Sequence, residues 1–165
     1  LDDLIRSWVL MLVQEHRASG NLEEAEHWLR TLRDLTPDLA ELQFHEAVQH
    51  WYAGHLTEAE AGFSEILARE PDDTAALAAR GQVRADLGRF AESLHDLGKA
   101  RDLLEAFESF ENIAYIESGR GLALAGLGRN AEADSAFDTS ASLAPDNAWL
   151  HFNQGLVAIW REDAG

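Results

Sequence analysis

The sequence predicts an all-α protein made of repeated helix pairs, because one turn pattern recurs along the chain at a nearly constant interval. A glycine is followed five residues later by a small residue, and four residues after that by Leu or Phe. The segments between these glycines have helical apolar spacing, and none has the alternation of a strand. Such a repeat predicts a solenoid, which offers a surface rather than a pocket. The copies start 34, 34 and 40 residues apart and comprise Gly20/Ala25/Leu29, Gly54/Ala59/Phe63, Gly88/Ser93/Leu97 and Gly128/Ala133/Phe137.

Each turn glycine is expected to end one helix, and a capping residue after it to begin the next. Asn21 and Thr57 open segments that resemble capping boxes, and Asn130 follows the turn in a later unit. The chain's three prolines follow the large apolar residue by eight positions, where a helix can open but not continue: Pro37, Pro71 and Pro145. The nine predicted helices cover residues 4–18, 22–35, 38–53, 57–69, 73–86, 90–106, 111–126, 130–142 and 146–161.

A small residue also tends to stand seven positions before the turn glycine, where the two helices of a pair would cross. Gly81, Gly121 and Gly155 hold this position in the later units, and Ala47 and Val13 hold it earlier. The pattern resembles the tetratricopeptide repeat, a 34-residue helix-turn-helix unit. The resemblance implies a right-handed α-solenoid of about four and a half units in a single domain, residues 1–165. The units would cover residues 4–37, 38–71, 72–111, 112–145 and, as a half unit or cap, 146–165.

Two units depart from the pattern. In the second, the apolar set Phe44, Ala47, Val48 and Trp51 fits better if the helix is rotated or if the register slips by one residue. The third is six residues longer and has Glu105 in the place of the proline. An apolar stripe with helical spacing predicts that the helix beginning at residue 90 continues through this extension. The stripe consists of Leu97, Ala100, Leu104, Phe107 and Phe110. The extension would either add to the core or form an exposed apolar ledge that a partner or a second copy could contact.

Composition narrows the classes of partner. Thirteen Lys and Arg against thirty Asp and Glu give a net charge of −17, which argues against nucleic acid and anionic membranes as partners. The acidic surface is either a solvated outer face or a groove for a basic partner. The sequence contains no cysteine, so disulfides and thiolate metal sites are excluded. The apolar run Trp8–Val13 is too short to span a membrane, so we expect a cytoplasmic protein. Because the sequence starts at Leu1, we expect a fragment or a processed protein.

No catalytic, cofactor or metal motif is found, so the sequence predicts a non-catalytic protein without a cofactor. His45 and His50 suggest a zinc-protease motif, but they are five residues apart, which places them about 140° apart around a helix. Gly119 and Gly121 lack the third small residue and the preceding strand of a dinucleotide loop.

The resemblance further implies that the first helix of each pair lines a concave groove that binds a partner. Chaperone-binding members have Lys and Asn where this chain has Leu10, Gln14, Phe44 and Val48, so their carboxylate clamp is absent. The half unit adds Trp149 and Leu156 to the same face. The candidate groove residues are Gln14, Glu41, Phe44, Val48, Trp51, Tyr52, Gln82, Asp86, Tyr115, Ser118, Leu122 and Phe152.

The candidate groove residues are mainly apolar and aromatic, with a few acidic side chains. Such a groove favours a hydrophobic or amphipathic segment of a peptide or protein, which could also carry Lys or Arg. Phe44 and Trp51 could instead pack between repeats. Two other functions remain open. The chain could be a self-associating scaffold that forms homo-oligomers through its terminal helix or its extended third unit, or the recruitment domain of a larger enzyme or regulator.

Overall fold

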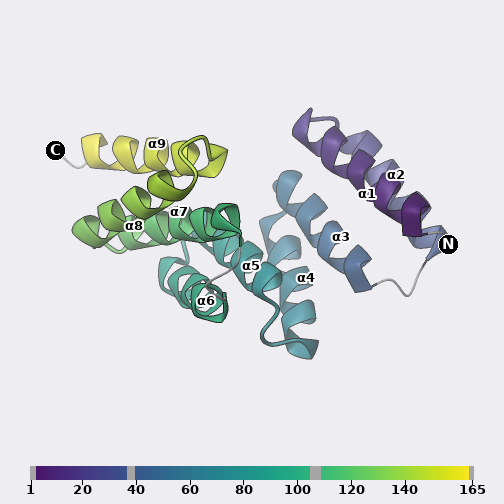
Figure 1. The fold of residues 1–165 in the computed structure, drawn as a ribbon, viewed down its shortest axis with the longest axis horizontal. Helices are drawn as coiled ribbons and strands as arrows, with labels where there is room; N and C mark the ends of the chain where they lie inside the picture. The colour runs from purple at the N-terminus through teal and green to yellow at the C-terminus, as the bar shows by residue number, and fades with distance from the viewer. Residues whose placement is uncertain (1–2, 37–39, 105–108, 164–165) are drawn as a thin grey trace. The chain divides into compact units, whose positions relative to one another are not determined.

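The computed structural model describes residues 3–36, 40–104 and 109–163, and within these ranges every regular element is an α-helix. The predicted all-α fold is therefore confirmed, and each described boundary lies within three residues of its expected place. Pro37, Glu105 and Phe107 lie outside the described residues. The helices are α1 (Asp3–Ala18), α2 (Leu22–Leu35), α3 (Ala40–Tyr52), α4 (Leu56–Arg69), α5 (Thr74–Asp86), α6 (Phe90–Leu103), α7 (Phe110–Gly126), α8 (Asn130–Leu143) and α9 (Ala148–Asp163) (Figure 1).

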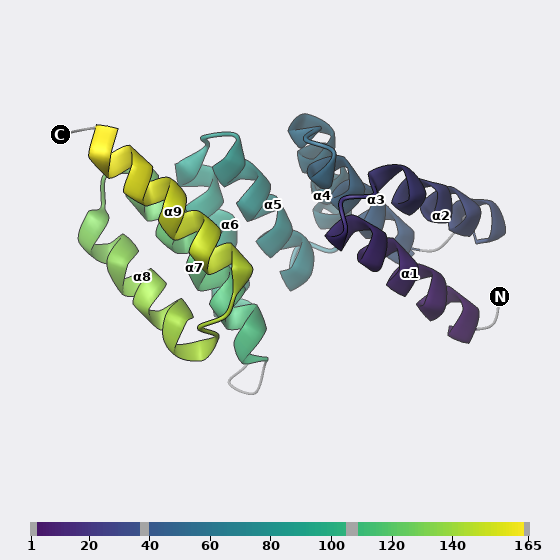
Figure 2. The same ribbon diagram turned by 90° about the horizontal axis from the view of Figure 1, so that it is seen from above.

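The chain divides into two compact units, Leu1–Arg69 and Glu70–Gly165. The first unit contains the pairs α1/α2 and α3/α4. The second contains the pairs α5/α6 and α7/α8, and α9 packs mainly on α7. The partners of each pair lie side by side in both views (Figures 1 and 2). The boundary between the units falls next to the expected end of the second repeat, and the single domain stays a prediction.

The turn glycines adopt the backbone conformation that the repeat requires. Their φ angles are 76°, 78°, 74° and 74°, in the left-handed region that other residues rarely adopt. In each turn the amide after the glycine donates a hydrogen bond to a carbonyl five residues earlier, which closes a Schellman motif. These bonds are Asn21 to His16, His55 to His50, Arg89 to Arg84 and Arg129 to Leu124, at 2.8 to 2.9 Å.

The predicted helix caps were only partly right. Asn21 Oδ1 accepts a hydrogen bond from the Glu24 amide at 3.4 Å, so this cap is confirmed. Thr57 and Asn130 are wrong as caps, because α4 already begins at Leu56 and Asn130 is the first helical residue of α8. Asp73 caps α5: its Oδ1 atom accepts a hydrogen bond from the Ala76 amide at 2.8 Å.

The helices of a pair cross where a small residue leaves room for a large one. A Cβ added to Gly81 would lie 2.6 Å from Leu97 Cγ, and one added to Gly121 would lie 2.6 Å from Phe137 Cε1. Real Cβ atoms do not approach so closely, so only glycine allows these side chains to fill the crossing. In every copy of the turn pattern, the small residue and the Leu or Phe after it are buried.

The second repeat keeps the regular register. Ala47 is buried, and its Cβ occupies the crossing opposite Gly62, where an added Cβ would lie 2.8 Å away. Gln43 is exposed and hydrogen-bonds to Arg69 of α4. The one-residue slip therefore does not occur.

The predicted extension of the helix that begins at residue 90 is wrong. α6 ends at Leu103, and Leu104 has a ψ angle of 123°, which is extended. The expected stripe is broken there: Leu97 and Ala100 lie in the core, whereas Phe110 begins α7 and is largely exposed.

Two buried carboxylates link helices in the second unit. Asp96 on α6 is 1% exposed, and its oxygens lie 2.7 and 2.9 Å from nitrogens of Arg80 and 2.9 Å from Arg84 Nη1. Glu117 on α7 lies 2.8 Å from Arg120 and 3.3 Å from Arg101 of α6. These charge-assisted contacts fix α6 against both α5 and α7, because a shift of α6 relative to α5 or α7 would leave a buried charge unpaired.

A buried arginine links α1 to α3 in the first unit. Arg17 Nε donates to Gln49 Oε1 at 2.8 Å, Arg17 Nη2 donates to the His45 carbonyl, and Gln49 Nε2 donates to the Leu22 carbonyl at 3.0 Å. Burial lowers the pKa of Arg17 to about 10, which still leaves the guanidinium charged at neutral pH. Burial, and secondarily the Arg17 charge, lower the pKa of His45, while Glu41 opposes this shift.

We expect the Gly81→Leu substitution to destabilise the protein by about 1–3 kcal/mol, because it overfills the crossing with Leu97. The melting temperature followed by circular dichroism should fall by at least about 2 °C. Gly98→Leu is the matched control: Gly98 also lies in a helix, but a Cβ there meets nothing within 4 Å. The control should melt at the same temperature or higher, since Leu favours a helix more than Gly does. Equal melting of the two variants would contradict the packing argument.

We expect acid to destabilise the first unit through His45. The folded protein keeps this imidazole neutral, whereas the unfolded chain binds a proton as pH falls below about 6.5, so stability is full above that pH and falls below it. In thermal melts between pH 7.5 and pH 5, His45→Gln should lose less stability than the unsubstituted protein. The same slope in both proteins would refute the role of His45.

Candidate functional site

Three aromatic rings form a continuous cluster in the second unit. The Tyr115 and Trp149 ring centroids are 6.0 Å apart at 80°, and those of Trp149 and Phe152 are 6.2 Å apart at 89°. Both contacts have the edge-to-face geometry that aromatic pairs prefer. Tyr115 and Trp149 are half-buried, and Phe152 is 54% exposed. We call Tyr115, Trp149 and Phe152 the aromatic cluster.

The repeat places these rings together. Tyr115 on α7 and Trp149 on α9 are 34 residues apart, so they hold the same position in successive units. Asn147 begins α9 by accepting hydrogen bonds from the amides of Trp149 and Leu150 at 2.9 and 3.3 Å. The two helices are joined by a buried hydrogen bond from Asn153 Nδ2 to Ser118 Oγ at 2.9 Å.

Three of the predicted groove residues pack inside the second unit instead. Gln82 is buried and donates to the Tyr115 carbonyl at 3.3 Å, which ties α5 to α7. Ser118 accepts the hydrogen bond from Asn153, and Leu122 belongs to the core beside Phe137. Their side chains are at most 1% exposed, so their assignment to a partner surface is wrong. The physical reason is that the following helices cover this face.

The remaining predicted residues of this unit are accessible. Asp86 at the end of α5 and Phe152 are exposed, Tyr115 is half-buried, and Leu156 is also half-buried. The structure brings Phe152 and Tyr115 together through Trp149.

In the first unit the predicted residues belong to α1 and α3. Gln14, Glu41 and Tyr52 are exposed, with Tyr52 at 48%. The Glu41 carboxylate lies 3.9 Å from Arg6 Nε, so it pairs with α1. Tyr52 packs edge-to-face on Trp51 with the centroids 6.4 Å apart.

Phe44, Val48 and Trp51 are half-buried. The Phe44 ring lies 5.5 Å from that of the buried Phe63 on α4, so Phe44 contributes to packing within its pair. This contact favours the packing interpretation for Phe44.

One cleft of the first unit was not expected from the sequence. Between α2 and α3, a cleft of about 220 Å³ is lined by Leu29, Gln49, His50, Ala53 and His55, together with Glu26, Arg33 and Glu46. Clefts of about 270 Å³ also lie between α8 and its neighbours α7 and α9. All three are smaller than common small-molecule sites, which measure roughly 300–1,000 Å³.

The histidines give no metal centre. His45 is buried, and its Nδ1 atom has no hydrogen-bond partner in the part of the chain that the structure describes. His50 and His55 are exposed, with their ring centroids 6.0 Å apart. Within the described ranges, no group of three or more His, Asp or Glu side chains is arranged to hold a metal ion.

None of the described helices combines the length and apolar character that crossing a membrane requires.

Comparison with known proteins agrees with this architecture. A sequence model of the tetratricopeptide repeat matches residues 44–102, which extend across the boundary between the two units. No curated protein matches the sequence.

Two solved structures of MamA, a tetratricopeptide-repeat protein, have a similar fold. A point mutant of MamA is 18% identical with a TM-score of 0.62, and the match covers 98% of this chain and 91% of the mutant chain. MamA AMB-1 in crystal form P212121 is 17% identical with a TM-score of 0.61, and the match covers 98% of this chain and 85% of the MamA chain. Residues 44–102 thus match the tetratricopeptide repeat by sequence, and the all-α fold of the chain, with its helix pairs and turn glycines, is similar to that of the two MamA structures.

Proposed function

We propose that this protein is a non-catalytic module that binds an apolar segment of a partner protein on the aromatic cluster. The observation that carries the proposal is the row of Tyr115, Trp149 and Phe152, which stays accessible although aromatic rings of this size normally enter a core. Tyr and Trp are the residues most often found at the energetic centre of protein interfaces. A likeness to tetratricopeptide repeats supports the same class of function, since these arrays present extended binding surfaces.

Charge favours a basic partner. The net charge of −17 attracts segments that carry Lys or Arg and accelerates their encounter at low salt. Asp86, at the end of α5 in the same unit as the cluster, is an exposed acidic residue. The favoured ligand is an amphipathic segment with a large apolar side chain for the cluster and cationic residues beside it.

We expect Trp149→Ala to weaken such binding at least tenfold, because the central ring of the cluster contacts both others. A labelled array of peptides that combine Leu or Phe with Lys would supply the ligand, and fluorescence anisotropy would measure its affinity. Tyr115→Ala should also weaken binding. Tyr52→Ala removes an equally large, exposed ring from the first unit and should leave affinity unchanged.

If Tyr52→Ala were the only variant with reduced affinity, the binding site would lie in the first unit. Unchanged affinity in Trp149→Ala and Tyr115→Ala, with helicity intact, would refute the aromatic cluster as the binding site.

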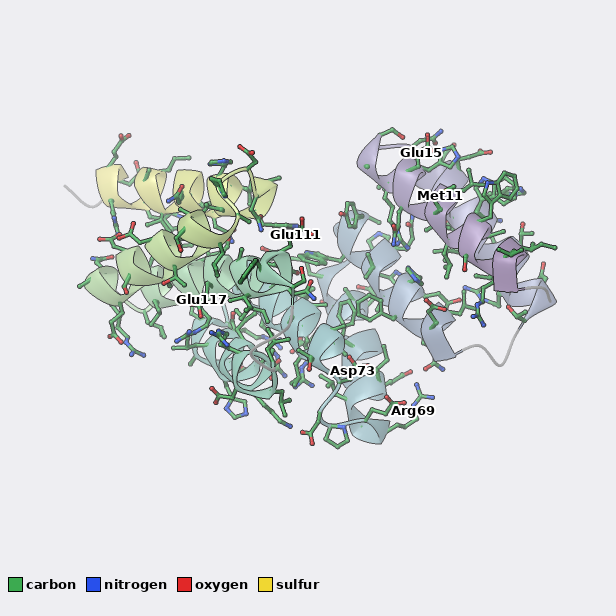
Figure 3. All side chains as sticks on the ribbon, viewed as in Figure 1. Met11, Glu15, Arg69, Asp73, Glu111 and Glu117 are labelled. Carbon is green, nitrogen blue, oxygen red and sulfur yellow. The ribbon has the colours of Figure 1, made fainter. Side chains whose placement is uncertain are left out.

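Self-association is a second candidate function, which is favoured by an apolar stripe on α1. Leu4, Trp8 and Met11 are spaced to share one side of this helix, and they are 79%, 56% and 53% exposed. Glu15 lies one turn after Met11, and its charge ends the apolar stripe (Figure 3). A patch of this kind is a common site for contact between copies.

We expect the scaffold function to show as a molar mass that rises with concentration in static light scattering. Trp8→Glu combined with Met11→Glu should then restore the mass of one chain, because the charges would have to be buried in the contact. A mass of one chain at all concentrations in the unsubstituted protein would rule out self-association as the main role.

A further inference from the structure

The cleft between α2 and α3 opens where the first unit departs from the repeat. Three positions are concerned: six residues after a turn glycine, four residues before one and one residue before one. The second unit has leucine at all three positions, as Leu94, Leu124 and Leu127. The first unit has Glu26, His50 and Ala53 there, and all three line the cleft.

The leucines of the second unit contribute to its packing. Leu124 is 4% exposed, and Leu94 packs against the core cluster that contains it. The first unit has shorter or polar side chains at the equivalent places, and a space of about 220 Å³ stays open. Leu29 lines this space and is itself 2% exposed, so it forms an apolar floor.

The opening lies inside the array. α2 packs on its pair partner α1, and α3 packs on α4, so the cleft lies between two complete pairs of one compact unit. It is therefore not the uncovered face of an incomplete pair. Its shape depends on the side chains that line it.

Several polar groups around the cleft are already engaged. Arg33 donates from Nε and Nη2 to Glu46 Oε1 at 2.7 and 2.6 Å, so these two charges neutralise each other. Gln49 accepts a hydrogen bond from Arg17 and donates one to the Leu22 carbonyl. These residues form walls of the cleft, and their polar groups would have to break existing contacts to bind a ligand.

Three groups at the cleft are available to a ligand: Glu26, His50 and His55. Within the described residues, the one ion pair of Glu26 is with Arg30 at 3.7 Å, and the side chains are 60% and 59% exposed. Such a pair is weak in water. The rings of His50 and His55 lie 6.0 Å apart and are tilted by 45°. Neither ring makes a hydrogen bond in the part of the chain that the structure describes.

The charges of the cleft favour a cation. Two carboxylates and one guanidinium line it, which leaves one negative charge, and the whole chain carries −17. A neutral imidazole accepts a hydrogen bond on one nitrogen. A guanidinium suits this set better than an ammonium does. Its five donors can reach a carboxylate and an imidazole together, and its planar face stacks on aromatic rings.

We propose that the cleft between α2 and α3 binds one arginine side chain of a partner protein. The methylene stem lies on Leu29 and Ala53, and the guanidinium lies beside Glu26, His50 and His55. The volume suits a single side chain, since it is below the roughly 300–1,000 Å³ of small-molecule sites. This site goes beyond the aromatic cluster, because all of its residues belong to the other unit.

The probe is N-acetyl-L-arginine N-methylamide, which mimics an arginine residue within a peptide chain. It would be titrated into the intact protein at about pH 7.5, where histidine is mostly neutral, while NMR follows the histidine ring signals. The signals of His50 and His55, assigned with the two His→Gln variants, should shift to saturation. Those of His95 and His151 in the second unit should not move. The citrulline derivative has nearly the same shape without the charge and should cause no shift.

Substitutions test the assigned groups, with circular dichroism as the check on folding. Glu26→Gln should weaken binding about fivefold, because it removes the carboxylate that meets the cation. Glu23→Gln is the matched control: Glu23 is an exposed acidic residue of α2 that does not line the cleft, so binding should stay unchanged. Ala53→Leu should abolish binding, because it fills the cleft with the residue that the second unit has at this position.

Several results would overturn the proposal. They are unmoved His50 and His55 signals at millimolar probe, equal shifts with the arginine and citrulline derivatives, equal effects of Glu26→Gln and Glu23→Gln, and unchanged binding in Ala53→Leu. Equal affinity for the lysine derivative would mean that the acidic protein attracts any cation, which also contradicts it. Trp149→Ala should bind the probe like the unsubstituted protein, so failure of this site and failure of the aromatic cluster can be told apart.

Discussion

The close crossing of two helices at a residue with little or no side chain is the constraint on which the rest of this structure depends. At Gly81 and Gly121 there is no space for a Cβ, and the volume is taken by Leu97 and Phe137 from the second helix. This contact fixes the distance and the rotation between the helices, and the left-handed turn glycine seven residues later sets the direction of return. In the second pair, Ala47 and Gly62 form a similar close crossing, whereas the first pair has the larger Val13 at this position.

Buried polar contacts add specificity to this apolar joint. Asp96 with Arg80 and Arg84 holds α6 to α5, and Asn153 with Ser118 holds α9 to α7. A register shift would leave these groups desolvated without partners, at a cost of roughly 1–3 kcal/mol for a neutral group and more for a charge. In the first unit, Arg17 performs this role through neutral oxygen acceptors on α3. The apolar crossings bring the helices together, and the buried polar contacts select a single register between them.

The proposed binding function rests on what this packing leaves uncovered. Aromatic side chains remain accessible where α7 and α9 present the same repeat position. This proposed surface is formed by packed helices, so it needs no ordering on binding, which lowers the entropic cost. The three clefts named above are smaller than common small-molecule sites.

The sequence alone determined the helices, their turns and the buried Leu and Phe positions, because these depend on local spacing and on glycine's access to positive φ. It also placed Tyr115 and Phe152 on accessible surface. Only the tertiary structure decided that Gln82, Ser118 and Leu122 are covered by later helices, that α6 stops at Leu103 and that Trp149 joins the two aromatic residues. Periodicity identifies one side of a helix, but neighbours distant in sequence decide which part of that side meets water, and this depends on helix crossings that local spacing does not encode.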